Sequence, residues 1–217
     1  MKQYIIIGLG RFGQSVARYL YKKNQNVLAI DYDEVKVHNI EETVTHAVAV
    51  DATDIDQLKN LGIADFDAAV VCIGGDIHAN VLATLNVKEL GVPYVVAKAQ
   101  TDLDKKLLAK IGADKIVNPE EDMGRKLSFD ILYSNIFDYI EFAPHCSLME
   151  IAASAKIEDK KLRELSWDHI DVNIIAIKRG GELHLNPGPG ETIQKDDILI
   201  IIGESEDLET LQHDLEE

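Results

Sequence analysis

A strand-like apolar run near the start of the chain leads directly into a glycine-rich turn. Residues 3–9 (QYIIIGL) form the run, and Gly8, Gly10 and Gly13 follow the spacing G-x-G-x-x-G. Such a turn lets a pyrophosphate approach the backbone and the N-terminus of the next helix. Similar turns also occur simply because a helix packs closely on a strand. The spacing alone therefore predicts a strand–turn–helix unit and only weakly indicates a dinucleotide.

An acidic residue at the end of the second strand-like run strengthens the prediction. Asp31 closes residues 26–31 (NVLAID), 21 positions after Gly10. In dinucleotide-binding folds a carboxylate at this place accepts hydrogen bonds from a ribose diol and repels a 2′-phosphate. Together the two features predict a site for a nucleotide whose ribose carries no 2′-phosphate.

The first 118 residues alternate between strand-like and helix-like segments, which is the rhythm of a parallel sheet covered by helices. Strands are expected at 3–9, 26–31, 46–51, 67–74, 94–99 and 114–119, with helices at 11–24, 33–42, 53–62, 77–91 and 103–113. Such strands with right-handed crossovers give a Rossmann-like, doubly wound α/β fold over residues 1–119.

The pattern changes after Pro119. Residues 120–140 predict one long crossover helix that leaves the sheet, and residues 141–217 predict a small α+β lobe. In that lobe, strands are expected at 148–154, 172–179 and 182–186, with a last strand ending near residue 203. Leu208, Leu211 and Leu215 recur at three- and four-residue steps, which predicts a final amphipathic helix.

Charge and cysteine content exclude several classes of protein. The formal net charge is −16, and binding to nucleic acid needs a basic face, so nucleic acid is not an expected partner. No segment reaches the roughly 18 apolar residues of a membrane span, and the first residues lack the pattern of a signal peptide. Cys72 and Cys146 show no metal-ligand spacing and are expected to be reduced thiols. We therefore expect a cytoplasmic protein.

Two basic residues are placed to meet phosphates. Arg11 follows Gly10 at the predicted helix N-terminus, where backbone amides and the helix dipole favour an anion. Its forked donors suit terminal phosphate oxygens, although a solvent-facing arginine is the alternative. Lys98 interrupts an apolar strand, and because burying an unpaired lysine is costly, it should reach a phosphate or a carboxylate.

Asp51 closes the third strand-like run, at the same edge of the predicted sheet as Asp31. It is either a contact for the adenine or ribose, or an aspartate that begins a helix.

The sequence offers little for catalysis. Its seven histidines are scattered without metal-ligand or triad spacing, and neither a serine elbow nor a Walker lysine occurs. The residues after 140 would also make a small substrate domain. A small NAD-dependent oxidoreductase and a stand-alone nucleotide sensor are both open hypotheses at this point.

A series of motifs along nearly all 217 residues resembles the regulator-of-potassium-conductance (RCK) family. The motifs are IGLGRFG (7–13), LAIDYDEVKV (28–37), HAVAVDATD (46–54), VVCIGGDIHANVLATLNVKELG (70–91), AKAQ (97–100) and KIGADKIVNPEEDMG (110–124). The likeness is strongest to the KtrA-like cytosolic gating subunits of Ktr/Trk-type bacterial potassium uptake systems.

The resemblance implies a non-enzymatic switch. Members of the family form homodimers that assemble into a homo-octameric ring beneath a membrane potassium channel or transporter subunit of the KtrB type. Exchange of ATP, ADP or NAD(H) changes the shape of the ring. The chain would then lie in the cytoplasm, held at the inner face of the cell membrane by its partner.

The resemblance also implies site residues. In the family pattern, the glycine turn and the positions of Arg11, Asp31 and Asp51 contact the nucleotide. Glu120 matches an acidic position that helps to hold a divalent cation, Mg²⁺ or Ca²⁺, near the phosphates. The full set expected at the nucleotide is Gly8, Gly10, Arg11, Phe12, Gly13, Asp31, Asp51, Ala52, Thr53, Ile73, Lys98 and Glu120.

Related gating subunits can bind cyclic di-AMP at a two-fold interface between C-terminal lobes. The residues that fit such a site here are Asn173 for a base edge, Ile174 and Ile175 for the walls of an adenine, Arg179 or His184 for a phosphate, and Pro187. Each has an ordinary alternative in a core strand or a hairpin end. The preceding stretch SWDHIDVN (166–173) holds two aspartates where an arginine would suit a phosphate, although Trp167 could stack on a base. We therefore expect weak binding of cyclic di-AMP or none.

Overall fold

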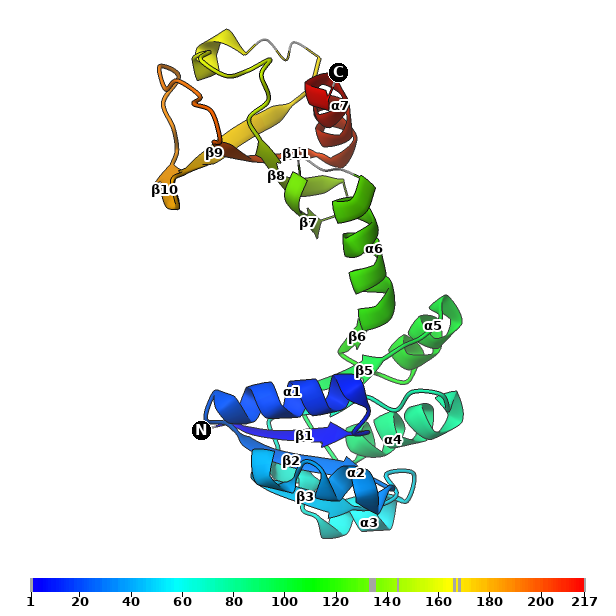
Figure 1. The fold of residues 1–217 in the computed structure, drawn as a ribbon. Helices are drawn as coiled ribbons and strands as arrows, with labels where there is room; N and C mark the ends of the chain where they lie inside the picture. The colour runs from blue at the N-terminus through cyan, green and yellow to red at the C-terminus, as the bar shows by residue number, and fades with distance from the viewer. Residues whose placement is uncertain (1, 133–135, 144, 166, 168, 217) are drawn as a thin grey trace. The chain divides into compact units, whose positions relative to one another are not determined.

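The computed structural model describes residues 2–132, 136–143, 145–165, 167 and 169–216. The chain forms two compact units, Met1–Asp122 and Met123–Glu217 (Figure 1). The first contains a parallel sheet and the second an antiparallel sheet.

The first unit alternates strands and helices. Its strands are β1 (Gln3–Ile7), β2 (Asn26–Asp31), β3 (His46–Ala49), β4 (Ala68–Val71), β5 (Val95–Lys98) and β6 (Lys115–Val117). Its helices are α1 (Arg11–Lys22), α2 (Glu34–His38), α3 (Ile55–Asn60), α4 (Ile77–Glu89) and α5 (Asp102–Lys110), and α6 (Pro119–Leu132) begins after β6. The strands are parallel in the order β3-β2-β1-β4-β5-β6. This doubly wound order, which reverses between β1 and β4, confirms the predicted fold class.

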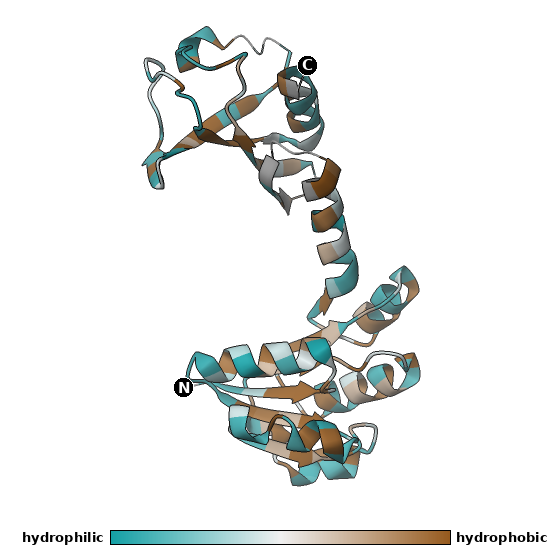
Figure 2. Cartoon of the chain, viewed as in Figure 1, coloured by the Kyte–Doolittle hydropathy of each residue, from teal (hydrophilic) through white to brown (hydrophobic). Residues whose placement is uncertain are grey.

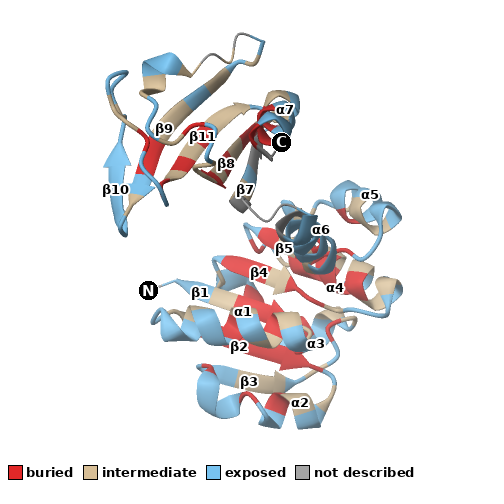
Figure 3. Ribbon diagram, turned by 45° about the horizontal axis from the view of Figure 1, so that its top comes forward, coloured by how far each residue is buried: buried red, intermediate tan, exposed pale blue. Residues whose placement is uncertain are grey.

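Both faces of the central strands β1, β2 and β4 are largely buried, which explains their runs of consecutive apolar residues. Ile5 and Ile7 of β1 belong to one core cluster, together with Val87 of α4. Ile6 belongs to a second cluster, together with Ala17 of α1. Successive side chains of a strand point to opposite faces, so a strand covered on both sides needs apolar residues at consecutive positions. Figure 2 shows the apolar stretches of these strands, and Figure 3 shows that the central strands β2 and β4 are largely buried, whereas the edge strand β3 is not.

The helices of the first unit differ in how they begin. Asp33, Asp54, Asp76 and Thr101 cap α2, α3, α4 and α5 by accepting hydrogen bonds from nearby backbone N–H groups. The N-cap of α1 is Gly10, and within the described residues no side chain caps this helix. Unpaired amides at a helix start carry partial positive charge and attract anions. The start of α1 is therefore open to an anionic ligand.

The second unit is an antiparallel sheet with helix α7 packed against it. The elements are β7 (Ile136–Ala143), β8 (Cys146–Ala152), β9 (Val172–Arg179), β10 (Glu182–Leu185), β11 (Ile198–Glu204) and α7 (Ser205–Glu216), and the strand order is β10-β9-β11-β8-β7. The three leucines that predicted the last helix are buried in one cluster with Met149 of β8 and Leu199 of β11. The predicted α+β lobe is confirmed.

The helix predicted over residues 120–140 ends early. α6 stops at Leu132, and Ile136–Ala143 form β7, in which Tyr139 lies opposite Met149 of β8. The sequence IFDYIEFA is rich in aromatic and β-branched residues, which favour a strand once a partner strand is present. The helical prediction is therefore wrong for residues 136–140, while residues 133–135 lie outside the described part of the chain.

Local turn chemistry fixes the hairpin between β9 and β10. Gly180 and Gly181 both have positive φ, 57° and 88°. A two-residue hairpin turn of this type needs φ above zero at both positions, which glycine adopts without strain. The predicted GG turn therefore sets the pairing of Arg179 with Glu182.

No described helix combines the length and the hydropathy that a membrane span requires. Both cysteines are free thiols, and Cys72 is buried at the end of β4.

Candidate functional site

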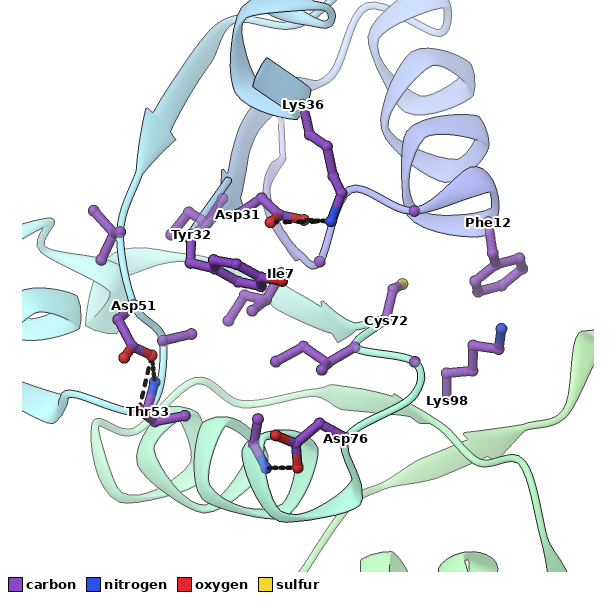
Figure 4. Close-up of a pocket in the computed structure, with 18 of the residues that line it drawn as sticks. Ile7, Phe12, Asp31, Tyr32, Lys36, Asp51, Thr53, Cys72, Asp76 and Lys98 are labelled. Atoms are coloured by element: carbon purple, nitrogen blue, oxygen red, sulfur yellow. Dashed lines mark hydrogen bonds and ion pairs between the residues drawn. The ribbon is translucent and has the colours of Figure 1, made fainter. Parts of the chain in front are cut away.

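A cavity of about 610 Å³ lies at the carboxyl edge of the parallel sheet (Figure 4). Its lining comes from the ends of β1, β2, β4 and β5, the loop after β3, the start of α2 and the first turns of α1, α4 and α6. The lining residues are Ile7, Gly8, Gly10, Arg11, Phe12, Ile30, Asp31, Tyr32, Lys36, Val50, Asp51, Ala52, Thr53, Cys72, Ile73, Gly74, Asp76, Ala79, Lys98 and Glu120. They surround the point where the strand order reverses, which is where open α/β sheets bind ligands. The volume is that of a small-molecule site.

The three glycines of the turn have different roles. Gly8 has a φ of +93°, and a Cβ there would lie 2.9 Å from the backbone of Cys72. A Cβ on Gly13 would lie 2.0 Å from the carbonyl oxygen of Gly8. Around Gly10, by contrast, no described atom lies within 4 Å of such a Cβ. Gly8 and Gly13 therefore allow helix and strand to pack closely, and Gly10 leaves room for a ligand.

Asp31 provides a fixed carboxylate on the cavity wall. The residue is 5% exposed and accepts the backbone N–H of Leu9 at 2.6 Å and that of Asp33 at 3.0 Å. Nζ of Lys36 lies 3.4 Å from both carboxylate oxygens. The two backbone donors hold the carboxylate where a ribose diol can donate to it.

Lys98 forms an ion pair with Glu120, and Figure 4 shows Lys98 beside Phe12, on the side of the cavity away from Asp51. Lys98 is 8% exposed, its Nζ donates to Oε1 of Glu120 at 2.5 Å, and it lies 6.0 Å from the centroid of the Phe12 ring. The predicted partner of Lys98 is thus a carboxylate. The hydrogen bond from Lys98 lowers the pKa of Glu120, the positive charge of Arg11 lowers it further, and partial burial opposes both.

Arg11 is exposed at the first position of α1 and lines the same cavity. Among the described residues its side chain has no hydrogen-bond or ion-pair partner. A free guanidinium beside the uncapped amides of α1 supplies several donors that suit phosphate oxygens.

The loop after β3 is held from two sides. Oδ1 of Asp51 accepts the N–H of Thr53 at 2.9 Å and its hydroxyl at 2.7 Å. Asn86 of α4 donates to the carbonyls of Ala52 and Thr53 at 3.1 and 3.0 Å. Asp54, not Asp51, caps the following helix. Asp51 therefore shapes the wall of the cavity and does not begin a helix.

Eleven of the twelve residues expected at a nucleotide line this cavity. Gly13 does not, because its role is in helix–strand packing. Four further lining residues with polar or aromatic side chains were missed by sequence reasoning: Tyr32, Lys36, Cys72 and Asp76. The available signal was position, since Tyr32 and Lys36 closely follow Asp31 and Asp76 caps α4.

The cavity holds few groups suited to catalysis. No described histidine lines it, and burial raises the pKa of the Cys72 thiol to about 12, with only partial opposition from Lys98. A thiol with such a pKa is protonated at neutral pH and is a poor nucleophile. Within the described residues no group of three or more His, Cys, Asp and Glu side chains could hold a metal ion. A cation here would need further oxygen ligands from a bound molecule.

Arg179, one of two residues considered for a phosphate contact, is hydrogen-bonded to internal partners in the second unit. Its guanidinium donates to both oxygens of Asp197 at 2.8 and 2.7 Å and to Oε1 of Glu191 at 3.1 Å. It also donates to the carbonyl of Thr192 at 2.9 Å. Asp197 is fully buried. A phosphate would have to displace a buried carboxylate, so Arg179 anchors the segment before β11.

The other residues considered in the second unit do not converge on one site. Ile174 packs against the hydrophobic core, whereas the preceding residue Asn173 is exposed. Neighbouring residues of a strand point to opposite faces, so these two side chains do not share a face. Of the rest, Ile175 lies at the bulge between β9 and β11, His184 is exposed and Pro187 is half-buried.

Two family models match the chain: the TrkA-N domain over residues 4–119 and the TrkA-C domain over residues 147–215. The Ktr system potassium uptake protein C of Bacillus subtilis (strain 168) is 43% identical over 208 residues, covering 95% of this chain and 94% of that protein. The Ktr system potassium uptake protein A of the same strain is 38% identical over 214 residues, covering 98% and 96%.

Among solved structures, the crystal structure of the GsuK RCK domain matches with a TM-score of 0.67. The sequences are 18% identical, and the match covers 100% of this chain and 48% of that one. At this identity the comparison concerns the fold.

Proposed function

The chain belongs to the RCK family, as its TrkA-N and TrkA-C domains and its Ktr relatives show, and from this premise we propose that it is the cytosolic regulatory subunit of a bacterial potassium channel or transporter. The observation that carries the proposal is the cavity at the switch point of the parallel sheet. There the uncapped backbone amides at the start of α1 and the guanidinium of Arg11 can bind an anion. Occupancy of this cavity by a nucleotide controls the membrane partner.

The proposed ligands are ATP and ADP, with NAD(H) using the same adenosine contacts. The ribose lies on Asp31, the adenine lies toward the loop Asp51–Thr53, and the phosphates lie on Arg11 and the start of α1. ATP carries a terminal phosphate that ADP lacks. Allosteric control requires that two ligands prefer different states of the protein, and contact between this phosphate and Arg11 supplies the difference.

A divalent cation, Mg²⁺ or Ca²⁺, joins the ligand through Glu120. Before ligand binds, Glu120 is paired with Lys98. A phosphate that takes the Lys98 ammonium releases the carboxylate, and the released oxygens with those of the phosphate suit a hard cation. Nucleotide and cation should therefore bind cooperatively.

We propose that the cavity binds a nucleotide as a regulatory ligand and does not serve as the active site of a dehydrogenase. The cavity offers a carboxylate-paired lysine and a protonated thiol, and no described histidine. Turnover of NADH with carbonyl substrates in a spectrophotometric screen would contradict this and favour the oxidoreductase alternative.

Homodimers that assemble into a homo-octameric ring, on a KtrB-like membrane subunit at the inner face of the cell membrane, complete the proposed assembly. The match to Ktr proteins over nearly the whole chain supports it. Copurification with such a subunit distinguishes this assembly from a stand-alone nucleotide sensor.

For the second unit we propose weak binding of cyclic di-AMP or none. The internal ion pairs of Arg179 and the separation of Asn173 from Ile174 on two faces support this.

Potassium flux through vesicles that contain the membrane subunit and this chain tests the proposed function. We expect the flux with ATP to differ from the flux with ADP, and the difference to vanish when this chain is left out. Equal flux with both nucleotides would contradict nucleotide control.

Arg11→Ala should weaken ATP binding by roughly 10-fold or more and leave adenosine binding unchanged, since a hydrogen bond to a charged group is worth about 1.5–3 kcal/mol. Isothermal titration with both ligands measures the difference. Arg18→Ala is the matched control, because Arg18 lies on the same helix and bonds to Gln14 outside the cavity. An equal loss for ATP and adenosine would remove the phosphate role.

Glu120→Gln should abolish the increase in ATP affinity that Mg²⁺ or Ca²⁺ produces, because the amide has lost its charge. ATP titrations with and without the cation measure the coupling. Glu121→Gln is the control, since Glu121 pairs with Lys105 and does not line the cavity. Cation dependence that persists in Glu120→Gln would show that the cation binds elsewhere.

A further inference from the structure

Tyr32 is a large aromatic residue that lines the cavity and yet is 78% exposed. It follows Asp31 directly at the end of β2, and Figure 4 shows its ring extending across the cavity between Asp31 and Asp51. A tyrosine ring presents an apolar face that can stack on another ring. Its exposure inside a cavity leaves an apolar face open to a ligand.

Lys36 holds this ring from one side. Its Nζ lies 5.3 Å from the centroid of the Tyr32 ring and 3.4 Å from both oxygens of Asp31. A cation over an aromatic face is attracted to it, and the same ammonium is attracted to the carboxylate. Lys36 therefore links the ring to Asp31, while most of the Tyr32 surface is exposed to a ligand.

We propose that the open face of Tyr32 stacks on the base of the bound nucleotide. This rests on the proposed function, which places the ribose on Asp31. One bond joins a base to its ribose, so a ribose held by Asp31 brings its base within reach of the next residue along the chain. Tyr32 thereby determines affinity for the nucleoside part of the ligand, whereas Arg11 and Lys98 determine affinity for its phosphates.

Stacking makes a specific prediction about ligands. Every base has a π face, so base–aromatic stacking tolerates different bases. Tyr32→Ala should therefore weaken adenosine, ATP and GTP by a similar factor, roughly 5-fold or more. Inorganic tripolyphosphate, which has no base, should bind as it does to the wild type.

Isothermal titration of the full chain with these four ligands tests the proposal. Tyr32→Phe keeps the ring and should retain the wild-type affinities. Tyr32→Leu keeps an apolar side chain without the ring and should bind adenosine, ATP and GTP more weakly. Tyr19→Ala is the matched control, because Tyr19 is 62% exposed, has Lys23 5.5 Å from its ring centroid and does not line the cavity. Tyr32→Trp gives an independent readout, since stacking on a base should quench its emission.

The outcomes separate the two proposals. A wild-type chain that binds neither adenosine nor ATP would overturn the proposed function and the role of Tyr32 together. Wild-type binding that is unchanged in Tyr32→Ala would overturn only the role of Tyr32. Weakened ATP with unchanged GTP would show that Tyr32 reads the edge of the base, and weakened tripolyphosphate would show a general effect on the cavity; either would contradict stacking.

Discussion

Replacing Gly13 with alanine should displace the start of α1 and abolish nucleotide binding. The added Cβ would lie 2.0 Å from the carbonyl oxygen of Gly8. That carbonyl is held in place, because Gly8 has a φ of +93° and its N–H donates to the carbonyl of Ile30 at 2.8 Å. The helix must therefore move away from the sheet. We expect a loss of about 3 kcal/mol or more in the free energy of unfolding of the first unit.

Urea unfolding followed by circular dichroism, with an ATP titration on the same preparation, measures both effects of Gly13→Ala. Gly10→Ala is the control, because no described atom lies within 4 Å of a Cβ there and the φ of −68° suits alanine. The control should keep its stability and lose only ligand affinity, since its methyl group enters the space for the phosphates. A Gly13→Ala variant as stable as the wild type would contradict the packing role.

Replacing Arg179 with methionine should destabilise the second unit by about 3–5 kcal/mol, the usual cost of leaving one member of a buried ion pair alone. The side chain of Asp197 is fully buried and would lose both hydrogen bonds from the guanidinium. Glu191 and the carbonyl of Thr192 would lose theirs as well. The segment that precedes β11 would then lose its anchor.

Fluorescence of Trp167 reports this effect directly. It is the only tryptophan of the chain, and it packs against the core of the second unit. Lys178→Met is the matched control, because Lys178 is an exposed neighbour on the same strand. A double variant with Asp197→Leu should recover part of the loss, since it removes the unpaired charge. An unchanged denaturation midpoint in Arg179→Met would contradict the anchoring role.

The ion pair between Arg179 and Asp197 makes the stability of the second unit depend on pH. Burial raises the pKa of Asp197, but hydrogen bonds from Arg179 and from the N–H of Gln194 outweigh it and lower the pKa overall. A carboxyl with a lower pKa in the folded chain stabilises the fold above its unfolded pKa, and this contribution is lost as pH falls through the folded pKa. The stability gap between wild type and Arg179→Met should therefore shrink below about pH 4. A difference in stability between the two proteins that does not change with pH would contradict this prediction.

The sequence predicted most where the signal is local. The run of isoleucines in β1, the glycine spacing and the position of Asp31 are all readable within about 30 residues, and they placed the cavity correctly. Strand β7 was missed because it owes its structure to pairing with β8, which a local helical pattern does not report. Likewise the partner of Arg179 is Asp197, which lies 18 residues away in the sequence.

Within the cavity, sequence reasoning identified charged residues better than the contacts between them. Lys98 was expected to need a partner, and the structure supplies Glu120 from α6. Tyr32 and Lys36 were overlooked because neither belongs to the glycine–aspartate spacing. Their importance follows only from the geometry that brings both side chains to Asp31.

Helix α6 carries the cavity residue Glu120 near one end and extends well beyond the cavity. Glu120 lies in its first turn, and the helix continues past Asp122, where the first unit ends, to Leu132. Its 14 residues span roughly 20 Å at 1.5 Å per residue. A rotation of about 10° at the first turn thus carries the far end by roughly 3 Å. In the proposed function, a phosphate that takes Lys98 from Glu120 acts on the first turn of this helix, whose remaining turns lead out of the first unit.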